Sequence, residues 1–182
     1  MGDINVFSGP MKCGKSMHIL TEYNRQLIAG KNAMMFKPKL DTRTGDNIVS
    51  TRDGKSLVAN NIEKIDELKN YDADVYFIDE FQFLDGDVRA IEDLAEKGKK
   101  FYIAGLNLTS DKKPFGKMGD LMCIADNIKM MTSICEICKN DNAVFSYFKG
   151  QKDTDIVLGD SEYIPVCRNC YEKLMKTKNS TI

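Results

Sequence analysis

Residues 3–16 read DINVFSGPMKCGKS, and this stretch decides the fold. Residues 3–8 form an apolar run typical of a short strand, and the residues from 16 to 29 repeat apolar side chains at helical spacing. Between them, residues 9–16 fit the pattern GxxxxGK[ST], in which a glycine-rich loop joins a strand to a helix. The sequence therefore predicts a strand, a phosphate-binding loop and a helix in direct succession.

The residues of this loop, called the phosphate loop below, suit a nucleoside triphosphate. Backbone N–H groups of the loop and of the helix N-terminus cradle phosphate oxygens, and glycine permits a close approach. Lys15 is expected to neutralise the β- and γ-phosphates, and the Ser16 hydroxyl to bind Mg²⁺. An accidental glycine turn before a helix is the alternative. The residues expected to contact ATP are Gly9, Pro10, Met11, Lys12, Cys13, Gly14, Lys15 and Ser16.

Two acidic residues follow a second buried strand. Residues 75–79 read VYFID, a continuous apolar run that is typical of a parallel strand, and Glu80 comes next. Asp79 is expected to hold the metal or its water shell, and Glu80 to accept a proton from a substrate hydroxyl. A strand that ends in solvated acids is the alternative, but the phosphate loop favours the catalytic interpretation.

Apolar runs alternate with helical patterns along the first 130 residues. Strands are expected at residues 33–36 and 101–104, and helices at residues 62–68 and 85–97. This alternation predicts an α/β core, residues 1–130, with a parallel sheet between two layers of helices. After Thr132 the sequence changes to short apolar segments, glycines and cysteines, with a helical pattern only at residues 171–175. We expect a separate small C-terminal module over residues 131–182.

Four of the six cysteines form two CxxC pairs. Cys135 and Cys138 are separated from Cys167 and Cys170 by 28 residues. Two such pairs suit one tetrahedral Zn²⁺, and four cysteines leave no open position, so the zinc is expected to be structural. A disulfide framework is the alternative, which the lack of a secretory signal pattern disfavours. The long insert between the pairs predicts a loop with its own task.

The composition narrows the class of partner. The chain has 182 residues, with 26 Lys and Arg against 27 Asp and Glu, which leaves no basic excess for a nucleic-acid groove. No apolar run approaches the roughly 20 residues of a membrane helix. We therefore expect a cytoplasmic protein with no nucleic-acid or membrane partner.

Together the motifs resemble the zinc-containing type II thymidine kinases. The resemblance rests on GPMKCGKS, DTR at residues 41–43, IDEFQF at 78–83, KKPFG at 112–116, and the pair CEIC and VCRNCY. It implies transfer of the ATP γ-phosphoryl group to the 5′-hydroxyl of thymidine or deoxyuridine, with Glu80 as the general base. It also implies a zinc ribbon whose lasso loop closes over the nucleoside, and a homotetramer or homodimer.

The resemblance further implies a nucleoside pocket, lined by Met11, Phe81, Phe115, Ser146 and Tyr163. Arg43 and Arg52 lie in polar loops, where they either reach the substrate or are solvated.

Some residues depart from the family pattern. Asn107 and Ser110 stand where relatives have an acid and an aromatic, Lys12 and Cys13 alter the phosphate loop, and Leu158 replaces a common glycine. The departures motivate one alternative, a divergent nucleotide-binding regulator without kinase activity. A zinc-ribbon ATPase that binds nucleic acid is the other alternative, and the neutral charge disfavours it.

Overall fold

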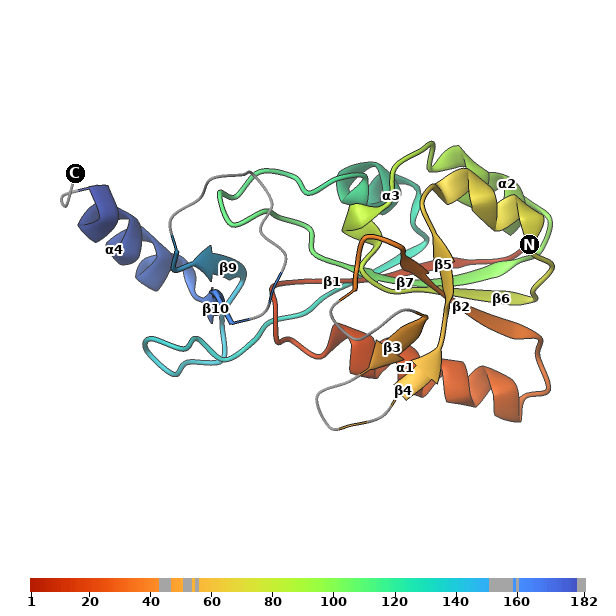
Figure 1. The fold of residues 1–182 in the computed structure, drawn as a ribbon, viewed down its shortest axis with the longest axis horizontal. Coiled ribbons are helices and arrows are strands. Elements are labelled where there is room, and N and C mark those ends of the chain that lie inside the picture. Colours follow the sequence, from red (N-terminus) through yellow and green to blue (C-terminus); the bar gives the residue numbers. More distant parts are fainter. Residues whose placement is uncertain (43–46, 51–53, 55, 151–158, 160, 180–182) are drawn as a thin grey trace.

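A six-stranded parallel sheet forms the centre of the computed structural model, which describes residues 1–182 apart from 43–46, 51–53, 55, 151–158, 160 and 180–182 (Figure 1). Arg43, Arg52 and Leu158 therefore lie outside the described residues. The strand order is β5-β2-β6-β7-β1-β8. The strands are β1 (Ile4–Ser8), β2 (Ala33–Pro38), β5 (Asn60–Ile62), β6 (Val75–Ile78), β7 (Lys100–Gly105) and β8 (Asn127–Met130).

Helices cover both faces of this sheet, which confirms the predicted α/β class (Figure 1). On one face lies α1 (Lys15–Ile28). The other face carries η1 (Ile65–Asn70), α2 (Arg89–Glu96) and α3 (Met118–Ile124). Successive strand residues point to opposite faces, so Phe77 packs towards α1 and Ile78 towards α2. The next residue, Asp79, continues this alternation onto the α1 face.

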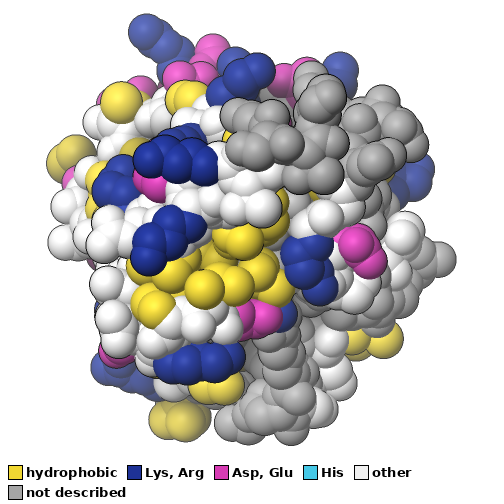
Figure 2. Space-filling model, turned by 90° about the vertical axis from the view of Figure 1, so that its left-hand side faces the viewer, with side chains coloured by type: hydrophobic (Ala, Val, Ile, Leu, Met, Phe, Trp, Pro, Cys, Tyr) yellow, Lys and Arg dark blue, Asp and Glu magenta, His cyan; other side chains and the backbone are white. Residues whose placement is uncertain are grey.

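The C-terminal module has its own hydrophobic cluster. It contains the antiparallel strands β9 (Phe145–Phe148) and β10 (Tyr163–Val166), followed by α4 (Arg168–Asn179). Lys112 and Arg168 place their cations 4.7 Å and 4.9 Å from the ring centroids of Tyr171 and Phe145. On the face of the molecule at the module end, Figure 2 shows hydrophobic side chains gathered together with Lys and Arg side chains around them.

Several elements differ from the prediction. No strand was expected at β8, which reads NIKM and is only four residues long; all four residues are exposed at the edge of the sheet. β5 was missed because it reads NNI, and the helix expected at residues 62–68 is the later 3-10 helix η1. The helix expected at 85–97 begins only at Arg89, because the side chain of Asp87 accepts a hydrogen bond from the Arg89 N–H. A small hairpin, β3 (Ile48–Ser50) and β4 (Ser56–Val58), and α3 were also not foreseen.

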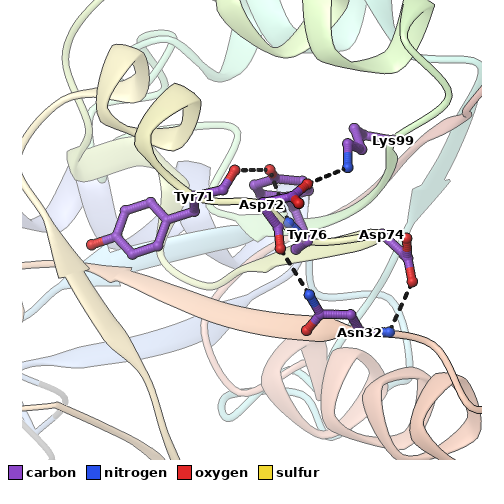
Figure 3. A network of polar contacts seen from close by, with 7 residues as sticks. Asn32, Tyr71, Asp72, Asp74, Tyr76 and Lys99 are labelled. Atoms are coloured by element: carbon purple, nitrogen blue, oxygen red, sulfur yellow. Dashed lines mark hydrogen bonds and ion pairs between the residues drawn. The ribbon is translucent and has the colours of Figure 1, made fainter.

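Polar contacts fasten the amino ends of β2, β6 and β7 (Figure 3). The side chain of Asn32 donates to the Asp72 backbone carbonyl at 2.7 Å, and its backbone N–H donates to Asp74 at 3.0 Å. Lys99 Nζ lies 2.8 Å from Asp72 Oδ1. These contacts join the amino ends of the three strands, at the end of the sheet opposite the phosphate loop. Among the described residues, no helix combines the length and the apolar character needed to cross a bilayer.

Candidate active site

The phosphate loop connects the carboxyl end of β1 to the first turn of α1. Gly9 has φ 154°, and a Cβ there would lie 2.3 Å from the backbone oxygen of Met131. Gly14 has φ 86° and is the N-cap of α1. Both positions therefore require glycine, the first for its close backbone contact and the second for its left-handed conformation. The first N–H groups of a helix have no acceptor within the helix, so those at the start of α1 are suited to binding an anion at this loop.

Lys15, the first residue of α1, folds its side chain back over the loop. Its ammonium group donates to the backbone oxygens of Gly9 at 3.2 Å and Pro10 at 2.7 Å, and lies 3.5 Å from the Cys13 sulfur. The residue is only 8% exposed. A cation buried this deeply beside the N-terminus of a helix interacts strongly with phosphate.

Asp79 lies at the carboxyl end of β6, on the α1 face. The Ser16 hydroxyl is close enough to its carboxyl group to favour the ionised form, and the Glu80 N–H donates to Oδ1 at 3.0 Å. Burial, reinforced by the neighbouring charge of Glu80, raises the pKa of Asp79 to about 7, although Ser16 and Lys15 oppose this shift. A buried carboxyl group beside a hydroxyl fits Mg²⁺, because an oxygen-bound dication stabilises the ionised form.

Glu80 directly follows, in a conformation that non-glycine residues seldom adopt. Its φ is 54° and its ψ is 37°, which turns the chain sharply into the short 3-10 helix η2 (Phe81–Phe83). Because of this turn, Glu80 diverges from Asp79 and is only partly buried. Two adjacent acids thus have separate environments, one suited to a metal and one suited to accepting a proton.

Gln82 holds the Glu80 side chain, a contact that sequence reasoning missed. Its side-chain nitrogen donates to Glu80 Oε2, and its side-chain oxygen accepts from the Leu106 N–H at 2.9 Å. Two glycines make room for it: a Cβ on Gly105 would lie 2.9 Å from the Gln82 side-chain oxygen, and one on Gly116 would lie 2.2 Å from its backbone oxygen. The IDEFQF motif contains Gln82, but its spacing alone does not reveal the partner.

The four cysteines of the two CxxC pairs lie together in the C-terminal module, with all sulfur atoms within 4.8 Å of one another. The sulfurs of Cys138 and Cys167 are 3.8 Å apart. In a tetrahedral Zn²⁺ site with bonds of about 2.3 Å, sulfurs are separated by about 3.8 Å. The residues therefore fit zinc in both chemistry and spacing.

The thiol groups of this cluster also favour a metal ion. Burial opposes ionisation of Cys135, but backbone N–H groups of Cys138, Cys167 and Ile137 lower its pKa to about 6. Burial and the three neighbouring sulfurs raise the pKa of Cys170 to about 12. The four thiols cannot all ionise side by side without a cation, and Zn²⁺ is a cation that would stabilise their thiolate forms.

Comparison with known proteins places these features in one family. A family model described as thymidine kinase matches residues 2–171. The chain belongs to the thymidine kinase family. Thymidine kinase of Pseudothermotoga lettingae is 34% identical over 95% of this chain and 96% of its own length. Thymidine kinase 1 of Dictyostelium discoideum is 35% identical over 99% of this chain and 82% of its own. Thymidine kinase of Choristoneura fumiferana entomopoxvirus is 36% identical, with 93% and 96% covered.

The residues that the thymidine kinase resemblance assigns to the nucleoside pocket are partly brought together. Met11 of the phosphate loop and Tyr163 of β10 form a buried cluster with Phe148 of β9, and Leu106 packs against it. The rings of Phe148 and Tyr163 have centroids 5.0 Å apart. Two of the five predicted pocket residues therefore lie side by side, where the phosphate loop contacts the C-terminal module.

Of the other three predicted pocket residues, Phe115 and Phe81 have different surroundings, whereas Ser146 also contacts Met11. Phe115 packs edge-on against Phe83, with ring centroids 5.4 Å apart. Phe81 is 0% exposed within the core cluster on the α2 face. The Ser146 hydroxyl accepts a hydrogen bond from the Met11 N–H at 2.9 Å. As substrate contacts of a thymidine kinase, these residues stay predictions.

Residues that depart from the thymidine kinase pattern have local partners. Lys12 Nζ lies 2.6 Å from Glu136 Oε1, so its charge is paired with the C-terminal module. The backbone oxygen of Asn107 accepts from the Phe115 N–H at 3.1 Å, and that of Ser110 accepts from the Tyr171 hydroxyl at 2.7 Å. The altered segment is thereby held against both the module and the loop that carries Phe115.

Proposed function

We propose that this chain transfers the γ-phosphoryl group of ATP to the 5′-hydroxyl of thymidine, with deoxyuridine as a second acceptor. The observation that carries the proposal is the arrangement of Lys15, Ser16, Asp79 and Glu80. The first two begin α1, and the Ser16 hydroxyl lies beside the carboxyl group of Asp79, the residue next to Glu80. Phosphoryl transfer asks mainly for positioning and for neutralisation of charge, and this group of residues supplies both.

Each of these residues has its own task. The phosphate loop, residues 9–16, surrounds the ATP phosphates with N–H groups, and Lys15 neutralises the β- and γ-phosphates. Ser16 and Asp79 hold Mg²⁺, which neutralises charge as it develops on the phosphate oxygens. Glu80 orients the 5′-hydroxyl and accepts its proton. The sharp turn of the chain at Glu80, where φ is 54°, separates this residue from Ser16 and Asp79, which are proposed to hold Mg²⁺.

The nucleoside is proposed to bind where the phosphate loop contacts the C-terminal module. Met11, Phe115 and Tyr163 offer apolar surface to the base, and Phe81 and Ser146 belong to the same proposed set. The cluster of Met11 with Tyr163 supports this placement. A loop fastened at both ends by zinc closes over the substrate and excludes water, which limits wasteful hydrolysis of ATP.

The chain is proposed to divide into an ATP-binding domain, residues 1–130, and a zinc-ribbon domain, residues 131–182. Separate hydrophobic clusters support this division. Zinc in the second domain would be bound by Cys135, Cys138, Cys167 and Cys170 and would be structural, since four thiolates fill its coordination sphere.

A homotetramer or homodimer that works in the cytoplasm, without nucleic acid or membrane, completes the proposal. The support for assembly is β8, an edge strand whose Ile128 and Met130 are 43% and 54% exposed. Light scattering on the purified protein tests it, and a monomer at all concentrations would remove the proposal of assembly.

The reaction is tested by incubating the protein and its Glu80→Gln variant with Mg·ATP and a panel of thymidine, deoxyuridine, deoxycytidine and purine deoxynucleosides. Thymidine monophosphate that forms with the wild type and is lost in the variant is the expected result. Bound ATP without product from any nucleoside would favour the nucleotide-binding regulator. Salt-dependent binding of DNA or RNA would favour the zinc-ribbon ATPase.

A further inference from the structure

The phosphate loop is in direct backbone contact with the start of the C-terminal module. The Met131 N–H donates to the Ser8 carbonyl at 2.7 Å, just before the loop begins. A Cβ on Gly9 would lie 2.3 Å from the Met131 carbonyl oxygen. The first residue of the loop and the first residue of the module therefore pack backbone to backbone.

Two serine hydroxyls of the module bond to the backbone of the loop. Ser133 Oγ donates to the Lys12 carbonyl at 3.0 Å, and Ser146 Oγ accepts from the Met11 N–H at 2.9 Å. These serines are 8% and 6% exposed. The two bonds hold the peptide units on either side of the Met11–Lys12 peptide. They therefore restrain the backbone of both residues and hold Lys12 at φ 64°, a value that lysine seldom adopts unaided.

An ion pair closes the same junction. Lys12 Nζ lies 2.6 Å from Glu136 Oε1, with side chains 26% and 38% exposed. Glu136 lies between Cys135 and Cys138, and its N–H donates to the Pro165 carbonyl at 2.9 Å, two residues before Cys167. Glu136, the partner of Lys12, is thus part of the first cysteine pair and is bonded to the strand that leads into the second.

We propose that Ser133, Ser146 and Glu136 are positioning residues for the phosphate loop, so that metal binding at the cysteines and ATP binding at the loop strengthen each other. The proposal rests on the function proposed above, since it needs ATP at this loop. The metal fixes the segments that carry these three residues, and the three residues fix the backbone and the side chain of the loop at Met11 and Lys12. Coupling between two binding sites is reciprocal, so ATP strengthens metal binding by the same factor.

The first test is the affinity for Mg·ATP, measured by isothermal titration calorimetry on the zinc-loaded protein. Ser133→Ala and Ser146→Ala are expected to weaken ATP binding about tenfold each, because a buried backbone group loses its partner. Lys12→Met is expected to weaken it about two- to fivefold, since its ion pair is partly exposed. Ser133→Thr and Ser146→Thr keep the hydroxyl and are expected to restore most of the affinity.

A matched control removes a similar ion pair elsewhere. Lys69 and Asp93 lie 3.1 Å apart, with side chains 46% and 52% exposed, and they belong to η1 and α2 on the other face of the sheet. Lys69→Met is expected to leave ATP affinity unchanged.

The second test is the affinity for Zn²⁺, measured by competition with a chelator of known zinc affinity, with and without saturating Mg·ATP. In the wild type, ATP is expected to shift the titration towards tighter zinc binding. The shift is expected to shrink in Ser133→Ala and Ser146→Ala. This readout does not depend on turnover and separates positioning from a general loss of stability.

The outcomes separate this inference from the proposed function. If the wild type binds ATP but all three of Ser133→Ala, Ser146→Ala and Lys12→Met bind it equally well, the positioning role is wrong and the kinase proposal stands. A zinc titration that ATP does not shift would also overturn it. If the wild type binds no ATP, both proposals fail. Should a serine variant not fold, Lys12→Met carries the comparison, because its side chain lies partly in solvent.

Discussion

The side-chain nitrogen of Gln82 donates a hydrogen bond to Oε2 of Glu80. Gln82 is 3% exposed, and its side-chain oxygen is fixed by the Leu106 N–H. With both ends of the amide bonded, Gln82 restricts the carboxylate that we propose as the general base to one orientation. Because a base works only at hydrogen-bond distance from the proton it takes, this restriction bears on the rate of transfer.

Replacing Gln82 by glutamate is expected to lower kcat about 10- to 100-fold, with little change in KM for ATP or thymidine. The substitution preserves the size and the acceptor for Leu106, but it replaces the donor to Glu80 with a carboxyl oxygen that repels the Glu80 carboxylate. Steady-state kinetics on both substrates measure the effect. An unchanged kcat would contradict the positioning role.

A double variant supplies the control for Gln82. If Gln82 acts through Glu80, then Gln82→Glu adds little loss once Glu80→Gln is present, whereas unrelated effects would multiply. Additive losses in the free energy of activation would therefore argue for a purely structural role of Gln82.

Lys15→Ala is expected to lower turnover by at least about 100-fold, because the phosphates lose the buried cation beside them. Radiolabelled ATP and thymidine measure the product. Lys31→Ala removes an exposed lysine just beyond the other end of α1 and is the matched control, with turnover expected near that of the wild type. Wild-type turnover in Lys15→Ala would refute the assignment of the phosphate loop.

Metal analysis of the natively purified protein is expected to give about one Zn²⁺ per chain. Cys167→Ser is expected to lose the metal and to lower the melting temperature, because metal binding contributes to folding. Cys123→Ser changes an exposed cysteine outside the cluster and is expected to retain the metal. A folded wild-type protein without zinc would refute the cluster as a metal site.

The raised pKa of Asp79 predicts how stability changes with pH in the absence of metal and nucleotide. Between about pH 4 and about pH 7, the folded state holds a proton on Asp79 that the unfolded state has released. The resulting contribution to the free energy of unfolding is therefore fully present below about pH 4 and is lost as the pH rises through about 7.

Urea unfolding at pH 5 and pH 8 checks this sign. Asp79→Asn is neutral at both values, so the stability of this variant relative to the wild type is expected to be greater at pH 8. A relative stability that is the same at both pH values would show that Asp79 ionises normally. Mg·ATP is expected to remove the penalty, since the metal favours the ionised carboxylate.

The parts of the fold that follow from the sequence are those with a strong local pattern. The strand, loop and helix of residues 3–29 were predictable because apolar spacing and glycines act locally. The cysteine cluster was predictable because two CxxC pairs have few other uses. β8 was not, because its polar–apolar alternation covers only the four residues NIKM, which is too short to distinguish a strand from a loop.

The contacts that complete the site were beyond sequence reasoning for another reason. Ser133 meets the Lys12 carbonyl across 121 residues of chain, and Leu106 meets Gln82 across 24. Such partners are chosen by the packing of strands and loops, and a serine beside a cysteine pair gives no local signal of its partner. Lys12 illustrates the limit, since nothing in the sequence indicates its ion pair with Glu136.

The two glycines around Gln82 have a consequence for sequence tolerance. A Cβ on Gly116, where φ is 52°, would lie 2.2 Å from the Gln82 backbone oxygen, and one on Gly105 would lie 2.9 Å from its side-chain oxygen. In a saturation mutagenesis screen selected on thymidine use, both positions would tolerate as little change as Glu80. The two glycines would thus score as essential although they have no side chain, because they leave the space for Gln82, which holds the proposed general base Glu80.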